Sequence, residues 1–181
     1  MKMILSGLPS PLGDMLLACD EAGRVRALEF SERRSRLHRS LKEQYGTCSL
    51  VNGASPAAVV TALTRYFAGE LAAIEAVEVQ TQGTELQENV WSQLRRIPSG
   101  KTLTYAEVGK AAGITDWRAA VDAGFAVGAN PIAIIVPCHR VLGTGGDLKG
   151  YAWGLHRKRW LLEHEGLLQP QQAAAQTASL F

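Results

Sequence analysis

The sequence predicts an α+β protein, with a small N-terminal α/β domain at 1–83 and a mainly helical domain at 84–167. Within residues 2–30, short apolar segments alternate with turn residues, a pattern typical of antiparallel strands. From residue 84 onward, apolar residues recur at helical spacing between capping residues and glycines. The Gln/Ala-rich stretch at 168–181 is expected to be a disordered tail.

The N-terminal domain is expected to contain a three-stranded antiparallel sheet and two helices. The strands fall within 2–30, followed by a helix at 31–45 that begins at a capping serine. A second helix at 55–68 carries proline at its favoured first position, and 73–80 is a candidate for one more strand. The basic side chains of the first helix are interpreted as a solvated face rather than a nucleic-acid patch, since acidic residues dilute them.

Composition and charge are those of an ordinary globular protein. Of the 181 residues, 46% are hydrophobic and 20% are charged, and the net charge is +2. This small surplus permits a modest, salt-sensitive affinity for DNA and argues against tight, charge-driven binding. The sequence has no segment typical of a membrane span, and its first residues are too polar for a signal peptide, so we expect a cytoplasmic monomer.

The three cysteines, Cys19, Cys48 and Cys138, form no CxxC pair, and the four histidines are scattered. No zinc-site spacing results, so no metal site is expected. Cys19 ends an apolar strand, which favours core packing, and Cys48 falls in a predicted loop with no assigned role. An odd number of thiols fits a reducing compartment.

The second domain begins with an amphipathic helix that follows Thr84. A short helix at 104–112 and a longer one at 116–128, capped by Thr115, are joined by a turn containing Gly113, which predicts a helix-turn-helix. The longer helix is rich in alanine and glycine. Such a helix either packs closely in a core or is slender enough for the DNA minor groove, about 6 Å wide, and composition favours neither.

An apolar run at 132–136 leads directly into Pro137, Cys138 and His139. Prolines at both ends predict a short strand buried on both faces, with Pro137 holding one thiol at the mouth of the core. A thiol becomes a strong nucleophile when a base or positive charge promotes its ionisation. Because adjacent residues point in different directions, His139 is expected to reach Cys138 through a water, with a carboxylate behind the imidazole. Taken alone, the Cys-His pair favours a buried structural cysteine.

Several further motifs accompany this stretch in a fixed order. They are Val90-Trp91, Ile97-Pro98-Ser99-Gly100, Thr104-Tyr105, Asn130-Pro131, Gly150-Tyr151-Ala152-Trp153-Gly154 and the run Lys158–Gly166. With Pro-Cys-His-Arg-Val they resemble, from about Glu85 to Gly166, the O6-alkylguanine-DNA alkyltransferases, also called methylated-DNA–protein-cysteine methyltransferases. The resemblance implies DNA repair by stoichiometric, single-turnover alkyl transfer from O6-alkylguanine in double-stranded DNA to Cys138, without a cofactor. O4-methylthymine is a second candidate substrate.

The resemblance also implies a catalytic role for each matching residue. Cys138 attacks the alkyl carbon, His139 takes the thiol proton through water, and Glu165 orients and charges the histidine. Tyr105 lies near the target phosphate and the anion that develops at guanine N3. Lys158 lies near the pocket and holds its wall.

The implied substrate pocket lies between the cysteine and the loop that follows it. Its members are Pro137, Val141, Tyr151, Ala152, Trp153 and Gly154. Backbone carbonyls at Cys138 and Val141 are implied to accept hydrogen bonds from the guanine amino group. Trp153 stands where some relatives have glycine, which predicts a narrow pocket that favours methyl over benzyl-sized adducts.

DNA is implied to bind through the helix-turn-helix in the minor groove, with the damaged nucleotide rotated out of the stack. The residues assigned to binding and base flipping are Tyr105, Arg118, Ala119, Ala123 and Asn130. Asn130 is implied to be a hinge whose side chain ties the recognition helix to the cysteine strand.

One position departs from the family's pattern. Relatives carry Arg-Ala-Val nine residues before the asparagine of Asn-Pro, and that arginine fills the gap left by the flipped base. Here Val121 stands nine residues before Asn130. Arg118, nearly one helical turn earlier, takes the role if the helix begins one turn sooner. Otherwise another group, such as an apolar wedge, fills the gap.

Three other functions compete with alkyl transfer. A non-transferring sensor of alkylated bases is the main alternative, but such proteins replace the acceptor cysteine, which is present here as Cys138. A cysteine hydrolase needs its histidine to reach the sulfur directly, which adjacency in sequence makes awkward. A DNA-binding regulator would keep its full activity without the thiol.

Overall fold

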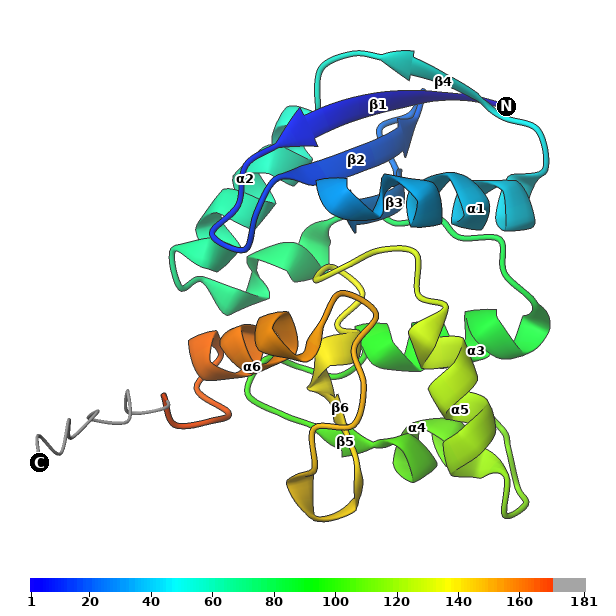
Figure 1. The fold of residues 1–181 in the computed structure, drawn as a ribbon, viewed down its shortest axis with the longest axis vertical. Coiled ribbons are helices and arrows are strands. Elements are labelled where there is room, and N and C mark those ends of the chain that lie inside the picture. The colour runs from blue at the N-terminus through cyan, green and yellow to red at the C-terminus, as the bar shows by residue number, and fades with distance from the viewer. Residues whose placement is uncertain (171–181) are drawn as a thin grey trace, which may run out of the picture.

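The fold, seen in a computed structural model that describes residues 1–170, has a sheet at one end and a cluster of helices at the other (Figure 1). The predicted α+β class, with a sheet first and mainly helices afterwards, is confirmed. Residues 171–181 of the predicted tail lie outside the described residues. Within 1–170, none of the helices has the length and apolarity needed to cross a membrane.

The N-terminal sheet has four strands in the order β3-β2-β1-β4, one more than predicted. They are β1 (Lys2–Leu8), β2 (Met15–Asp20), β3 (Val25–Phe30) and β4 (Ser49–Asn52). The first three form the predicted antiparallel meander, and β4 runs parallel to β1 at the edge. The side chains of β4 are exposed or half-buried without alternation, so only backbone pairing identifies it as a strand.

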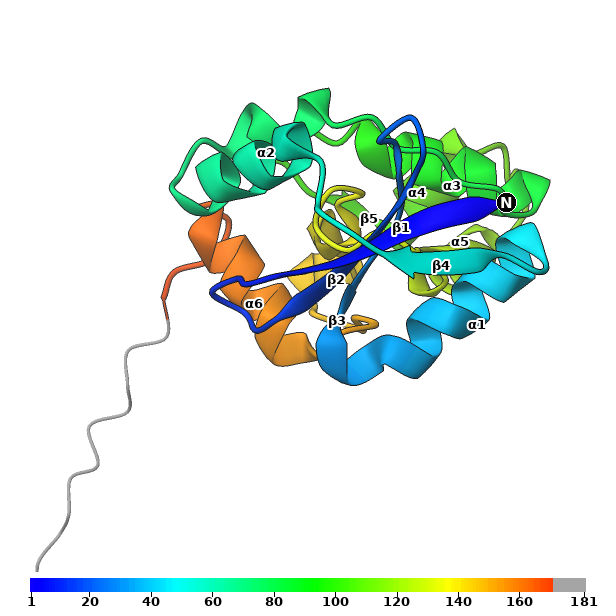
Figure 2. The same cartoon turned by 90° about the horizontal axis from the view of Figure 1, so that it is seen from above.

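Two helices cover opposite sides of this sheet (Figure 2). The predicted helix at 31–45 is present as a 3₁₀ turn followed by α1 (Arg34–Tyr45), and the next helix is α2 (Ala57–Phe67). The strand expected at 73–80 is wrong. A 3₁₀ helix occupies Leu71–Ala76, and only a single bridge to β3, between Val25 and Val79, follows it.

The C-terminal half is built from four helices. They are α3 (Glu85–Arg95), α4 (Tyr105–Ala111), α5 (Ala119–Gly128) and α6 (Leu155–His164), with a two-stranded parallel pair β5 (Leu103–Thr104) and β6 (Val141–Leu142). Thr84 and Thr104 begin α3 and α4 with capping boxes, in which each threonine hydroxyl accepts from the third backbone N–H.

The predicted helix-turn-helix is formed by α4 and α5. The two helices touch closely at Gly109, where an added Cβ would lie 2.3 Å from the carbonyl oxygen of Ala119. Its second helix starts later than predicted: Arg118, not Thr115, occupies the N-cap position. This later start fixes which side chains of α5 face outward.

The strand expected at 132–136 is also wrong. Ile132 makes one bridge to Leu28, after which the chain turns, and Ile134 adopts a left-handed φ of 67°. Within residues 1–170, the only backbone bonds from 131–136 to a strand are made with Leu28, which donates to Pro131 O (3.0 Å) and accepts from Ala133 N (3.0 Å). The remaining backbone bonds are turns within the segment, such as Val136 N to Ile132 O at 3.3 Å. Burial of an apolar run does not specify its backbone conformation.

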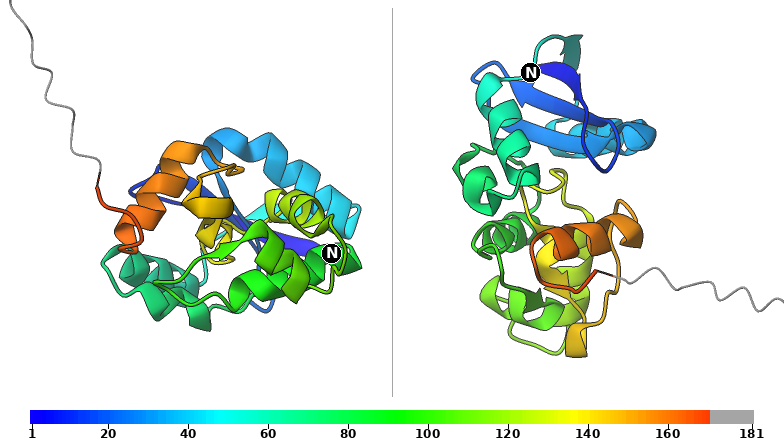
Figure 3. Two further views of the ribbon diagram at one scale, coloured as in Figure 1. Left: turned by 90° about the horizontal axis from the view of Figure 1, so that it is seen from below. Right: turned by 90° about the vertical axis from the view of Figure 1, so that its left-hand side faces the viewer.

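The buried 131–137 segment lies between the sheet and the helices (Figure 3). Its side chains belong to one apolar cluster that also contains Leu28 of β3, Tyr66 of α2 and Leu161 of α6. The two halves of the chain therefore share a continuous core, and the cysteine that follows this segment is placed by contacts from both.

Candidate active site

Cys138 lies at the start of a single 3₁₀ turn, Cys138–Arg140, directly after the buried segment. Only 3% of the residue is exposed, and its backbone N–H donates to Val136 O at 2.8 Å. Burial raises the pKa of the thiol, because it disfavours the charged thiolate. A hydrogen bond from Asn130 and the positive charges of Lys158 and Arg36 act in the opposite direction. The thiol is thus enclosed yet surrounded by groups that favour its anion.

Glu165 is the polar centre of the site. Its carboxylate accepts from Arg140 Nε (2.8 Å) and a second Arg140 nitrogen (2.9 Å), from the Tyr66 hydroxyl (2.7 Å), and lies 2.8 Å from His139 Nε2. All of these side chains are buried. Burial alone would raise the pKa of Glu165, but His139 and Arg140 outweigh it and lower that pKa, so the group is a carboxylate.

His139 is neutral and its tautomer is set by this carboxylate. Burial lowers the pKa of His139, against the opposing influence of Glu165. An ionised carboxylate only accepts hydrogen bonds, so Nε2 of the neutral ring carries the proton and Nδ1 keeps a free lone pair. Nδ1 is buried and has no hydrogen-bond partner among the described residues. A basic nitrogen is therefore free inside the site.

Asn130 joins the end of α5 to the turn that precedes Cys138. Its Nδ2 donates to Val136 O at 2.9 Å, and its Oδ1 accepts from Ile132 N at 2.9 Å. The side chain is fully buried, so both bonds form away from water. These are contacts of the kind that a hinge between helix and cysteine requires.

Lys158 is a buried cation on α6. Its Nζ donates to Val141 O (2.6 Å) and Gly150 O (3.0 Å) and lies 5.7 Å from the centre of the Tyr105 ring. Burial lowers the pKa of Lys158 to about 8, although Cys138 and Asp147 act to raise it. Burial also raises the pKa of Tyr105, which keeps its hydroxyl protonated as a donor.

The loop 150–154 is anchored from the N-terminal half. Trp153 is fully buried, and its Nε1 donates to the Glu29 carboxylate of β3. Arg36 of α1 binds the same carboxylate at 2.8 Å and lies 4.9 Å from the Trp153 ring centre. Tyr151 packs edge-on against Trp153, with a buried hydroxyl that has no partner in residues 1–170. Trp153 therefore holds the loop 150–154 against β3 and α1.

Arg36 corrects the interpretation of the first helix as a purely solvated basic face. It donates to Gly128 O (2.9 Å) and Asn130 O (3.0 Å), which places it at the end of α5. Sequence reasoning missed Glu29, Arg36 and Tyr66 as neighbours of the site. No local signal marks them, because each lies in an ordinary amphipathic strand or helix far from Cys138 in sequence.

A surface cavity of about 490 Å³ lies beside the site, between α4, α5 and the loop 143–149. Its lining residues are Thr104, Tyr105, Ala106, Ala120, Val121, Gly124, Phe125, Gly143, Thr144 and Lys149. Cys138 is not among them, since the thiol is buried. Tyr105 belongs to both places: it lines the cavity, and its ring faces the ammonium group of Lys158.

The two halves of the chain match two family models. The 6-O-methylguanine DNA methyltransferase ribonuclease-like domain matches residues 3–81, and the DNA binding domain of the same enzyme matches residues 85–167. The methylated-DNA–protein-cysteine methyltransferase of Salmonella typhimurium is 42% identical over 170 residues, which cover 93% of this chain and 98% of the relative. The chain belongs to the 6-O-methylguanine DNA methyltransferase family.

Other members of this family agree in sequence and in fold. The methylated-DNA–protein-cysteine methyltransferase of Methanosarcina acetivorans is 40% identical over 157 residues, covering 87% of this chain and 94% of the relative. The crystal structure of Mycobacterium tuberculosis OGT in complex with DNA has a TM-score of 0.73 and 38% identity, and covers 90% of this chain and 92% of that chain.

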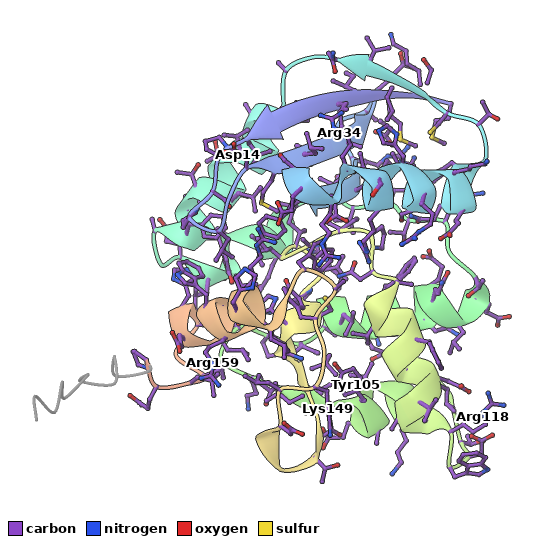
Figure 4. All side chains as sticks on the ribbon, in the orientation of Figure 1. Asp14, Arg34, Tyr105, Arg118, Lys149 and Arg159 are labelled. Atoms are coloured by element: carbon purple, nitrogen blue, oxygen red, sulfur yellow. The ribbon has the colours of Figure 1, made fainter. Side chains whose placement is uncertain are left out.

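The family's DNA-binding helix differs here from our expectation. Ala119 and Ala123, which we assigned to DNA contact, are 3% and 0% exposed and face the protein interior. Their small size serves the close approach of α4 and α5. Arg118 is exposed but pairs with Asp122 at 3.2 Å, and Figure 4 shows it at the N-terminal end of α5, apart from Tyr105. The fully buried Asn130 likewise touches protein rather than solvent.

Proposed function

We propose that this protein repairs O6-alkylguanine in double-stranded DNA by transferring the alkyl group once, irreversibly, to Cys138. The observation that carries the proposal is the buried Cys138–His139–Glu165 group, in which the carboxylate fixes the imidazole and leaves Nδ1 free. In this reading residues 1–83 are a scaffold, residues 84–167 bind DNA and hold the chemistry, and the protein acts in the cytoplasm as a monomer.

The thiol loses its proton to His139. Nδ1 is the acceptor, through a water, since direct contact between adjacent side chains is geometrically awkward. The imidazolium that forms is stabilised by Glu165, whose lowered pKa keeps it ionised throughout. Lys158 stabilises the thiolate electrostatically in an enclosed site, where charges interact more strongly than in water.

The thiolate sulfur then attacks the alkyl carbon. A carbon–sulfur bond forms, the carbon–O6 bond breaks, and its electron pair leaves with guanine. The developing anion spreads to N3, where the protonated hydroxyl of Tyr105 donates a hydrogen bond or proton. Carbonyl oxygens of Cys138 and Val141 hold the guanine amino group. No further co-reactant is needed, so the transfer balances without a cofactor.

The target base must leave the helix to react. The thiol is 3% exposed, so a base stacked in duplex DNA cannot reach it. The cavity beside Tyr105, on the outer side of the helix-turn-helix, is the place where DNA docks and the nucleotide rotates inward. Because water does not hydrolyse a thioether at a useful rate, each molecule reacts once.

Intact mass measured before and after mixing with a duplex that contains one O6-methylguanine tests this proposal. We expect a gain of about 14 Da, one methylene, on the peptide that holds Cys138, with one equivalent transferred per protein. A Cys138→Ser variant is the control and should gain no mass. Binding of the damaged duplex without any mass gain would overturn transfer in favour of a non-transferring sensor.

A further inference from the structure

The outer face of α5 carries an exposed apolar stripe. Trp117, Val121 and Phe125 follow one another at helical spacing and are 86%, 52% and 77% exposed. Large apolar side chains gathered on one exposed face mark a surface that meets a partner. On this side the helix is not slender, because Ala119, Ala123 and Ala126 are buried whereas the three large side chains of the stripe are exposed.

Two members of the stripe lie beside the active site. Val121 and Phe125 line the cavity that also contains Tyr105, whereas Trp117 does not. Between them stands Gly124, where an added Cβ would be 3.9 Å from the Tyr105 ring. The bare backbone at Gly124 leaves space next to Tyr105, flanked on both sides by apolar side chains. Under the proposed function, a rotated nucleotide would pass this space on its way to the thiol.

Arg118 is poorly placed to enter the same space. It is the N-cap residue of α5, and its guanidinium is engaged with Asp122 at 3.2 Å. Neither Arg118 nor Asp122 lines the cavity. Val121 occupies the position nine residues before Asn130, and its side chain is uncharged.

We propose that Phe125, with Val121 beside it, is an apolar wedge that enters the base stack and fills the gap left by the flipped nucleotide. The inference rests on the proposed function. Apolar side chains inserted from the minor groove unstack base steps and kink the duplex, so a ring and a branched aliphatic group suit this task. The occupant of the stripe is double-stranded DNA, because the stripe continues the cavity beside the site and lies within the DNA-binding domain.

Single-turnover methyl transfer from duplex and from single-stranded oligonucleotides separates a wedge from other roles. A side chain that opens the base stack should affect the transfer rate only when the substrate is a duplex. We expect Phe125→Ala to slow transfer from the duplex by about ten- to a hundredfold, and transfer from the single strand by less than about twofold. Val121→Ala should slow the duplex reaction less, and Trp117→Ala least, since Trp117 lies outside the cavity.

Val60→Ala is the matched control, because Val60 is a half-exposed valine in the middle of α2, remote from the site. Its rates should equal those of the wild type on both substrates. Phe125→Leu, which keeps an apolar wedge, should retain more duplex activity than Phe125→Ala. All the exposed positions tolerate truncation without loss of core packing, and unchanged thermal unfolding midpoints verify this.

A fluorescent pyrrolocytosine placed opposite the lesion gives a second readout that needs no chemistry. In a Cys138→Ser background, binding should quench this orphan base through contact with Phe125, and Phe125→Ala should abolish the quenching. This measurement still tests the wedge if alkyl transfer itself fails. Equal losses on both substrates, a larger duplex-specific loss for Arg118→Ala, or a DNA-free dimer that Phe125→Ala dissociates would each overturn the proposal.

Discussion

Cys19 in the sheet and Cys138 beside the helices are both free, buried thiols, and their surroundings differ in chemical character. Cys19 is the last residue but one of β2 and belongs to the apolar core, and burial, with the neighbouring charge of Asp20, raises its pKa to about 12. Burial also raises the pKa of Cys138, but there Asn130 and the charges of Lys158 and Arg36 oppose the rise. Burial alone makes a thiol inert, and the neighbours decide whether it can react.

The largest expected difference between Cys138 and Cys19 is in methyl transfer to the protein. Cys138→Ser should abolish methyl transfer, because a buried hydroxyl is a far weaker nucleophile than a thiolate. Cys19→Ser should retain the full transfer stoichiometry, measured by intact mass after mixing with damaged duplex. Methyl found on Cys19, or residual transfer in Cys138→Ser, would contradict this difference between the two cysteines.

The second test removes the carboxylate that organises the Cys138 region. Glu165→Gln leaves Arg140 buried without its counter-charge, so we expect a loss of about 3–5 kcal/mol in the free energy of unfolding. Transfer should also slow by about a hundredfold or more, since His139 loses its orienting partner. Urea unfolding and single-turnover kinetics measure the two effects.

Glu70→Gln is the control for this carboxylate. Glu70 is an exposed acid that pairs with exposed Arg65, so its neutralisation should leave stability and transfer unchanged. Similar losses for the two variants would show that the buried group has no special role.

The third test weakens the connection between α5 and the cysteine. Asn130→Ala leaves Ile132 N without its partner, and this buried unpaired group should cost about 1–3 kcal/mol in the free energy of unfolding. It also removes one of the two donors to Val136 O, the other being the Cys138 backbone N–H. Transfer should slow as the cysteine turn loosens. Asn52→Ala, on the exposed edge strand β4, should have no effect in the same denaturation and kinetic assays. An equally stable Asn130→Ala protein would contradict the proposed hinge.

The smallest effect concerns pH. The Lys158 pKa of about 8 implies that its charge, which favours the thiolate, is lost as pH rises through 8. The logarithm of the transfer rate should therefore rise less steeply with pH above 8, within about a tenfold range. Lys158→Gln should be slower and should show no break at pH 8. A wild-type pH–rate profile without a break at pH 8 would show that the charge of Lys158 does not favour the Cys138 thiolate.

Lys158 also affects stability in a defined direction. Its pKa in the folded protein lies below the ordinary value of 10.5, so the unfolded chain binds more protons between pH 8 and 10.5. The charged form of Lys158 should therefore destabilise the fold in full below pH 8, and this destabilisation should decrease as pH rises through the window. Urea unfolding of the wild type and of Lys158→Gln on either side of pH 8 checks the sign.

Local sequence patterns predicted those features that depend on the backbone of a few neighbouring residues. The helix starts at Thr84 and Thr104, the three-stranded meander and the helix-turn-helix were all predicted. The incorrect strand predictions concern features that local sequence does not fix. β4 is a strand only because β1 pairs with it, and 132–136 is buried by elements on all sides without being a strand. Pairing and enclosure both come from distant parts of the chain.

By itself, the sequence determined the α+β class, the family resemblance and the thiol on which the chemistry rests, because motif order and spacing are properties of the chain. Only the tertiary structure decided that Glu165 gathers His139, Arg140 and Tyr66, and that Glu29 and Arg36 anchor Trp153 in the loop 150–154. It also decided that α5 turns Ala119, Ala123 and Ala126 inward and Phe125 outward. Protonation and exposure depend on neighbours in space, and distant segments become neighbours only in the folded chain.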